Sequence, residues 1–331
     1  MTESELKALG SEKRRRRHIV AAFVLLLWLL WVFGQVFRDS TWLTSLFFYI
    51  PSPVLLLFLV GCSCYAWRKN HRLAAGLLAS MALLPAFFVL RVENRFRTGE
   101  QNRPNGDVLR LVHWNVFRGH LGWDGIENAL RQRKADICVL SEIPEEADIQ
   151  ATARSFGQGY SAIRISNLAV VARGSLRDGK WLRREDGVKA YGVVWESPQG
   201  RCRIMVVDLA SRLLLARQPR LQQVRALMVD WRADIVVGDF NAPRRSRALS
   251  PLPLGFVHAY EVAGSGCSYT WPVPCPVYEI DQCILGRRIR PLSYDLESSW
   301  RSDHKQQVLE FTVEELVQQT GQPDLQSPVA L

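Results

Sequence analysis

The sequence predicts an α/β fold in which two mixed sheets pack face to face with helices outside, preceded by an α-helical membrane region. Residues 19–91 are dominated by apolar side chains, whereas the rest of the 331-residue chain is rich in charge, much of it arginine. In that second part strand and helix patterns interleave, and several neighbouring strands are spaced as hairpins. The length fits one or two domains.

Three apolar runs, at 19–37, 43–67 and 73–90, are long enough to cross a bilayer, which takes about 20 residues. Prolines interrupt the second and third, but proline is tolerated in spanning helices when neighbours satisfy the freed carbonyls. The first run is longer than the apolar core of a signal peptide and two more follow it. We therefore expect a retained, multi-pass membrane region at 19–91 after a basic cytoplasmic N-terminus at 1–18.

Positive charge predicts the orientation of this region. The densest basic cluster is 13–17, and Arg68, Lys69 and Arg72 lie between the second and third runs. Cytoplasmic loops carry an excess of Lys and Arg. The N-terminus is therefore expected inside and the soluble domain outside the cytoplasm, at the inner (plasma) membrane, although the basic residues of 91–97 would then lie outside. The net charge of +10 also fits a polyanionic substrate or anionic lipid heads.

The soluble part begins after a polar linker at 92–107 and is expected to form a catalytic domain at 108–315. Residues 108–115 alternate as a strand, and Ile126 and Leu130 recur at helical spacing. The tail at 316–331 is polar and is expected to be disordered. Strands are predicted at 108–115, 136–140, 160–165, 168–172, 191–196, 203–208, 234–237, 279–285 and 307–312, and helices at 123–134 and 217–231.

The cysteines indicate no zinc site, because none has close CxxC spacing with a second pair. Cys267 and Cys275 flank a proline-rich loop. They could form a disulfide in an oxidising compartment, or remain free thiols.

Polar side chains stand at the ends of several predicted strands. Asn115 ends the first strand, Glu142 follows the second, Asp239 and Asn241 follow the strand at 234–237, and His304 precedes the last. Each has a simpler interpretation as a turn, a helix cap or an exposed loop residue. Together they predict metal-assisted attack of water on a phosphate ester. A hard divalent ion takes carboxylate and amide oxygens, the water needs a base, and the phosphoryl group needs donors.

Taken in order, Trp114-Asn115, Ser141-Glu142, Gly238-Asp239-Phe240-Asn241 and Ser302-Asp303-His304 resemble the endonuclease/exonuclease/phosphatase superfamily over roughly 108–312. The resemblance implies a four-layered α/β sandwich and Mg²⁺, with Mn²⁺ as an alternative, as cofactor. It implies Glu142, Asn115 and Asp303 as metal ligands. It gives Asp239 the attacking water and Asn241, with Asn115, contacts to the phosphate.

The resemblance also implies that His304 acts on the phosphate and that Asp281, in Ile280-Asp281, fixes its tautomer. Many members carry a His where this chain has Asp208. Asp208 could contact the leaving group, hold a second cation or be structural. Phe117 stands where some relatives have a further acidic ligand, which favours one metal over two.

The substrate is expected to be a phosphate ester of a nucleic acid or a phospholipid head group, with membrane lipids around the anchor and no obligate protein partner. Arg118, Arg244, Arg245 and Arg247 lie near the predicted cleft. We expect Arg244 and Arg245 to rim it, unless they belong to a solvated loop. The alternative function is a non-catalytic membrane scaffold or binding protein that keeps the fold, although such a copy tends to lose Glu142, Asp239 or His304.

Overall fold

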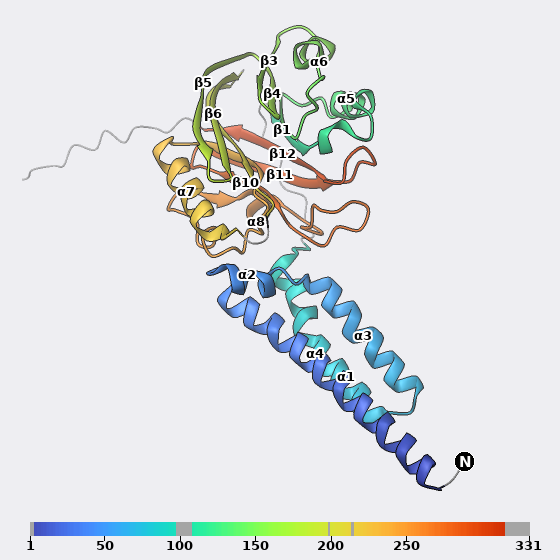
Figure 1. Ribbon diagram of the computed structural model, residues 1–331. Helices are drawn as coiled ribbons and strands as arrows, with labels where there is room; N and C mark the ends of the chain where they lie inside the picture. Colours follow the sequence, from blue (N-terminus) through green and yellow to red (C-terminus); the bar gives the residue numbers. More distant parts are fainter. Residues whose placement is uncertain (1–2, 97–107, 198, 213–214, 315–331) are drawn as a thin grey trace, which may run out of the picture.

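The computed structural model describes residues 3–96, 108–197, 199–212 and 215–314, which form a helical rod joined to a two-sheet sandwich (Figure 1). Most of the predicted linker, from 97 onward, and the predicted tail at 316–331 lie outside the described residues.

The rod contains α1 (Glu3–Phe37), α2 (Trp42–Phe48), α3 (Ser52–Arg68) and α4 (Arg72–Phe87), which continues as a π-helix η1 (Phe88–Glu93). Two stretches, Arg14–Phe37 and Arg72–Glu93, are long and apolar enough to cross a membrane. The expected second span is broken, because α2 and α3 meet at 53° and count as a span only when taken together. Pro51 explains the break, since it donates no backbone hydrogen bond and disfavours helical geometry in the residue before it.

The two ends of the rod carry different groups. At the far end, Arg16 and Arg17 line the same hollow as the α3–α4 connection, 69–72. At the near end, the C-terminal end of α1, α2 and η1 meet the sandwich (Figure 1). Between the ends, large apolar side chains such as Leu57 and Leu83 face outward. Exposing so large an apolar surface to water is unfavourable, whereas the lipid tails of a bilayer would cover it.

Each sheet has six strands and is mixed. The first has the order β11-β12-β1-β2-β4-β3 and the second β5-β6-β7-β8-β10-β9. Parallel pairing joins β1 to β2 and β7 to β8, and the other named pairs are antiparallel. The strands are β1 (Leu109–Asn115), β2 (Ile137–Ser141), β3 (Tyr160–Ile165), β4 (Leu168–Arg173), β5 (Ser175–Glu185), β6 (Val188–Ser197), β7 (Gly200–Leu209), β8 (Ile235–Asp239), β9 (Val257–His258), β10 (Asp281–Leu285), β11 (Ile289–Glu297) and β12 (Gln306–Val313).

The sheets bury a common apolar core, to which Leu111 and Val139 contribute from one sheet and Val206 and Val237 from the other. Helices α5 (Trp123–Gln132) and α6 (Ile149–Phe156) cover the outer face of the first sheet, and α7 (Arg217–Asp230) that of the second. The order helix, sheet, sheet, helix confirms the predicted four-layered sandwich.

Three edge strands, β5, β9 and β11, and the short helices α6 and α8 were not predicted. Strand β5 is mostly exposed and rich in charge, and β11 contains Pro291 and a register shift, so neither shows clean alternation. Helix α6 is short, but its start was readable. Asp148 caps it by accepting hydrogen bonds from the N–H groups of Gln150 and Ala151. Short connecting elements complete the domain: η2 (Phe117–Gly119) and α8 (Ala259–Ala263).

Candidate active site

A row of three aspartates lies along one edge of the second sheet. The parallel register of β7 and β8 pairs Asp208 with Asp239, and the antiparallel register of β8 and β10 pairs Asp281 with Asp239. Gly238 permits this close pairing. Its φ is +155°, and a Cβ there would lie 1.9 Å from the carbonyl oxygen of Val207. Position 238 has no room for a side chain, so glycine there lets β8 approach β7 closely and brings Asp239 beside Asp208.

Asn115 connects the two sheets. At the end of β1, its Nδ2 donates to Asp239 Oδ2 at 3.0 Å and to Glu142 Oε1 at 3.2 Å. Its Oδ1 accepts from the N–H of Phe117 at 3.1 Å. Asn115 therefore turns its amide hydrogens, not its oxygen, toward the carboxylates. Glu142 has a φ of +53°, a left-handed conformation that is uncommon outside glycine and is often found at functional sites.

His304 and Asp281 form a buried pair, with His304 Nδ1 2.9 Å from Asp281 Oδ2. Burial alone would lower the pKa of His304, but Asp281, with Asp239 and Asp303, raises it to about 9. Burial would likewise raise the pKa of Asp281, but His304 holds it below its usual value. The imidazole is therefore protonated at neutral pH, and Nε2 is the nitrogen left for a substrate.

Asp239 is a buried carboxylate whose negative charge is only partly stabilised by its neighbours. Its Oδ1 accepts from the N–H of Asn241 at 2.8 Å. Burial and the neighbouring carboxylate of Asp281 raise the pKa of Asp239 to about 8, while His304 opposes the rise. A cation beside Asp239 would favour its ionised form.

The donor set fits a hard divalent ion. Asp239, Asp281 and His304 place one ligand atom each within 4.8 Å of one another, but the His304–Asp281 hydrogen bond and the pairing of Asp239 with Asp281 across β8 and β10 already account for that closeness. Asp303 offers a clearer signal. Its Oδ2 accepts from Trp271 Nε1 at 2.8 Å, whereas its buried Oδ1 has no hydrogen-bond partner among the described residues. Asp303 and the part-exposed Glu142 offer carboxylate oxygens, the ligand type that Mg²⁺ prefers, and these two residues would hold the ion.

The other two predicted residues have local partners. Asn241 also has a left-handed φ, +48°, and its Nδ2 donates to the Leu209 carbonyl at 2.8 Å. Asp208 Oδ2 accepts from Lys189 Nζ at 2.9 Å and from Asn167 Nδ2 at 3.1 Å. Lys189 was not predicted. Its signal was a charged residue within an otherwise buried strand, β6.

A buried histidine beneath the site was also missed. Gln307 Nε2 lies 2.7 Å from His113 Nδ1, and His113 Nε2 lies 3.1 Å from Ser141 Oγ. Burial lowers the pKa of His113 to about 4, so the ring is neutral. Since Gln307 Nε2 can only donate, His113 Nδ1 accepts from it and the ring proton is on His113 Nε2. The alternation of β1 places His113 on the same face as Leu111 and Asn115, which is the signal that could have found it.

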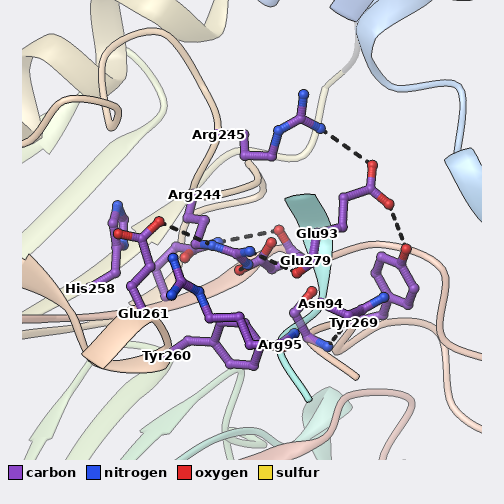
Figure 2. Close-up of polar contacts among 12 residues, drawn as sticks. Glu93, Asn94, Arg95, Arg244, Arg245, His258, Tyr260, Glu261, Tyr269 and Glu279 are labelled. Atoms are coloured by element: carbon purple, nitrogen blue, oxygen red, sulfur yellow. Dashed lines mark hydrogen bonds and ion pairs between the residues drawn. The ribbon is translucent and has the colours of Figure 1, made fainter. Parts of the chain in front are cut away.

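The prediction that Arg244 and Arg245 rim the site is wrong, and so is the alternative of a solvated loop. Figure 2 shows both arginines in a polar network between the rod and the sandwich. The Arg244 side chain is 2% exposed, pairs with Glu279 and donates to the carbonyls of Val92 and Glu93 at 3.0 and 2.7 Å. Arg245 pairs with Glu93 at 3.3 Å.

The chain after η1 is docked by the same network. Asn94 Oδ1 accepts from the N–H of Ser268 at 2.7 Å, and the N–H of Arg95 donates to the Tyr260 hydroxyl at 2.8 Å. The first residues of the predicted linker are therefore packed against the sandwich. Of the predicted substrate-binding arginines, Arg118 lies beside the site, with Nε 3.9 Å from Glu142 Oε2.

Cys267 and Cys275 are exposed free thiols.

Comparison with known proteins gives a likeness of fold. No family model and no curated protein matches the chain. An endonuclease/exonuclease/phosphatase family protein from Bacteroides thetaiotaomicron has a TM-score of 0.50 at 15% identity, covering 63% of this chain and 99% of its own. The human Nocturnin catalytic domain has a TM-score of 0.50 at 19% identity, covering 62% and 93%. A functionally unknown conserved protein from Enterococcus faecalis V583 has a TM-score of 0.51 at 15% identity, covering 62% and 100%. With the site geometry above, these matches show that the sandwich has the fold of the endonuclease/exonuclease/phosphatase superfamily.

Proposed function

We propose that the chain is a membrane-anchored, Mg²⁺-dependent phosphoesterase that hydrolyses a phosphodiester or phosphomonoester by attack of water. The observation that carries the proposal is the meeting of Asn115, Glu142 and Asp239 with the buried His304–Asp281 pair. The Nocturnin domain, which shares the fold, was solved with a bound sulfate anion. Sulfate and phosphate are both tetrahedral oxyanions, so the same kind of site suits a phosphate group.

Each residue has a role that follows from its contacts. Protonated His304 donates from Nε2 to a phosphate oxygen, and Asp281 fixes the ring and stabilises its charge. Asp239 takes the proton of the attacking water, held in place by Asn115 and by the N–H of Asn241.

Glu142 and Asp303 are proposed to hold Mg²⁺, which when bound polarises the phosphate and offsets its charge. Asp208, neutralised by Lys189, is assigned a supporting role at the edge of the site.

The test uses the full chain in detergent, with bis(p-nitrophenyl) phosphate and p-nitrophenyl phosphate as substrates. We expect turnover with Mg²⁺, loss of turnover with a chelator, and a fall of about 100-fold or more in Glu142→Gln, because a ligand is lost. Glu145→Gln is the matched control, since Glu145 is exposed three residues further on. Turnover that persists both with the chelator and in Glu142→Gln would contradict the Mg²⁺ dependence and the role of Glu142. Absence of turnover of both esters by the wild type would support the alternative of a non-catalytic scaffold.

A further inference from the structure

The site lies next to the membrane-facing end of the sandwich. Tyr278 lines a small hollow together with Tyr49, Ile50 and Pro51 of the α2–α3 turn. The Tyr278 ring centre is 5.7 Å from that of Trp271, which is 6.4 Å from that of His304. One pair of aromatic rings therefore separates the proposed acid from the rod.

A second contact joins the rod to the loop that follows the proposed base. The Tyr49 hydroxyl lies 3.4 Å from the Asn241 carbonyl oxygen. Because Asn241 is two residues from Asp239, the end of β8 rests directly on the α2–α3 turn. The two contacts lie on segments next to different strands, since Tyr278 precedes β10 and Asn241 follows β8, so the site has a fixed position at the end of the rod.

Exposed apolar side chains lie on the two loops beside the site. Trp300 is 76% exposed and precedes Ser302-Asp303-His304, while Leu121 is 47% exposed on the loop after η2. Arg301 Nη1 lies 3.5 Å from the Leu121 carbonyl and joins the loops. In Figure 1 the β11–β12 loop projects on the side toward which the rod runs. Tryptophan, with arginine beside it, is the side chain favoured at the level of lipid head groups.

We propose that the loops carrying Trp300 and Leu121 rest on the bilayer surface, and that the site takes its phosphate ester from the head group of a membrane lipid. This rests on the proposed phosphoesterase function and narrows its substrate. The rod, the Tyr278–Trp271 pair, the site and the exposed Trp300 loop follow one another along the same end of the sandwich.

The contacts of Arg244, Arg245 and Trp271 leave these three side chains unavailable to a nucleic acid. A single strand is held by a basic groove with free aromatic faces for its bases. Here Arg244 and Arg245 are used in the junction, and Trp271 is packed beside Tyr278 while donating to Asp303.

The experiment uses the full chain reconstituted into vesicles of phosphatidylcholine, phosphatidylglycerol and phosphatidate in equal parts, with Mg²⁺. Release of phosphate or of a phosphorylated head group is measured beside turnover of bis(p-nitrophenyl) phosphate and of a single-stranded oligonucleotide in the same sample. The variants are Trp300→Ser, Trp300→Tyr and Leu254→Ser. Leu254 is the matched control, because it is 91% exposed and lines a hollow with Asp234, at the opposite end of β8 from Asp239.

We expect wild type to release the lipid product. Trp300→Ser should lower that release about tenfold and leave bis(p-nitrophenyl) phosphate turnover unchanged, since the loss is in surface contact. Trp300→Tyr, an interfacial aromatic, should restore the release, and Leu254→Ser should change neither reaction.

Equal lipid release by wild type and Trp300→Ser would overturn the proposed surface. Cleavage of the oligonucleotide without lipid release would overturn the substrate class while leaving the phosphoesterase function intact. Absence of turnover on every ester would reject both.

Discussion

His304 is held in one orientation by Asp281, because its Nδ1 and the Asp281 carboxylate are buried and 2.9 Å apart. The two should therefore act as one unit. We expect His304→Ala and Asp281→Asn each to lower kcat/KM by about 100-fold or more, and the double variant to lose little beyond either single one. A double-mutant cycle on kcat/KM measures this. Strictly additive losses would mean that Asp281 is a structural strand residue and that its assigned role is wrong.

The buried His113 should make the unfolding free energy of the protein depend on pH. Its pKa is lowered by burial from 6.5 to about 4, so the folded chain resists its protonation. The stability that this group contributes is complete above about pH 6.5 and is lost as the pH falls toward 4. Between about pH 7.5 and pH 5 the loss is about 2 kcal/mol. We expect His113→Asn to unfold with a correspondingly smaller dependence on pH, measured by denaturant unfolding in detergent.

The exposed His120 provides the control for that experiment. His120→Asn should keep the wild-type pH dependence. If both variants keep it, His113 is protonated without cost and the ring is not held neutral by its surroundings.

The residues that sequence reasoning could place at the site are those with a local signal. Asn115, Glu142 and Asp239 each end or follow an apolar strand, and the Ser-Asp-His triplet precedes the last strand. A few neighbouring residues in the sequence were therefore enough to predict each of these positions. Lys189 had only its charge within a mostly buried strand as a signal, and the local signal of Arg244, its place directly after Asn241-Ala242-Pro243, pointed to the wrong location. Their partners Asp208 and Glu279 are 19 and 35 residues away in the chain, and only the sheet registers bring them together.

At the scale of elements, the junction depends on a buried ion pair. Arg244 is 2% exposed and pairs with Glu279, itself buried, while it holds two carbonyls at the end of η1. Removing one partner leaves the other charge buried and unpaired, which costs about 3–5 kcal/mol. We expect Arg244→Gln to lower the unfolding free energy of the full chain by about that amount, measured by denaturant unfolding in detergent. Arg247→Gln, at an exposed position three residues on, should have little effect. Equal stability of the two variants would contradict the importance of the junction.

The elements themselves were predicted where periodicity is strong. The sequence predicted the strands that are buried on both faces and the helix that contains Ile126 and Leu130. It also predicted that two sheets pack face to face. Strand β5 was missed because an edge strand with many exposed charges has no apolar face to detect. Proline in the second apolar run marked the position of the break between α2 and α3, but the sequence did not predict the change of direction. The 53° angle depends on how the turn packs beneath the sandwich.

At the scale of the whole molecule, the two ends of the rod predict topology. Arg16 and Arg17 share the far end with the α3–α4 connection, while the sandwich sits at the near end. With the basic residues inside, a reporter that works only outside the cytoplasm should be active when fused after Leu331 and inactive when inserted at Asn70. A cytoplasmic reporter should give the reverse pattern. Activity of both fusions on one side would show that the helices do not separate the two ends across the membrane.

The docking of Asn94 and Arg95 has a kinetic consequence. A catalytic domain on a loose tether samples a volume whose radius grows with tether length, so the effective concentration at which it meets a membrane substrate falls as the tether lengthens. Here the chain is fixed to the sandwich before the connecting segment begins, so the length of that segment does not set the reach. On the proposed membrane anchoring, this docking would keep the site at one height above the bilayer, where it would meet molecules that diffuse within the membrane plane. Its rate should then follow the number of substrate molecules per unit of membrane area, and dilution of the vesicles at constant composition should leave turnover per enzyme unchanged.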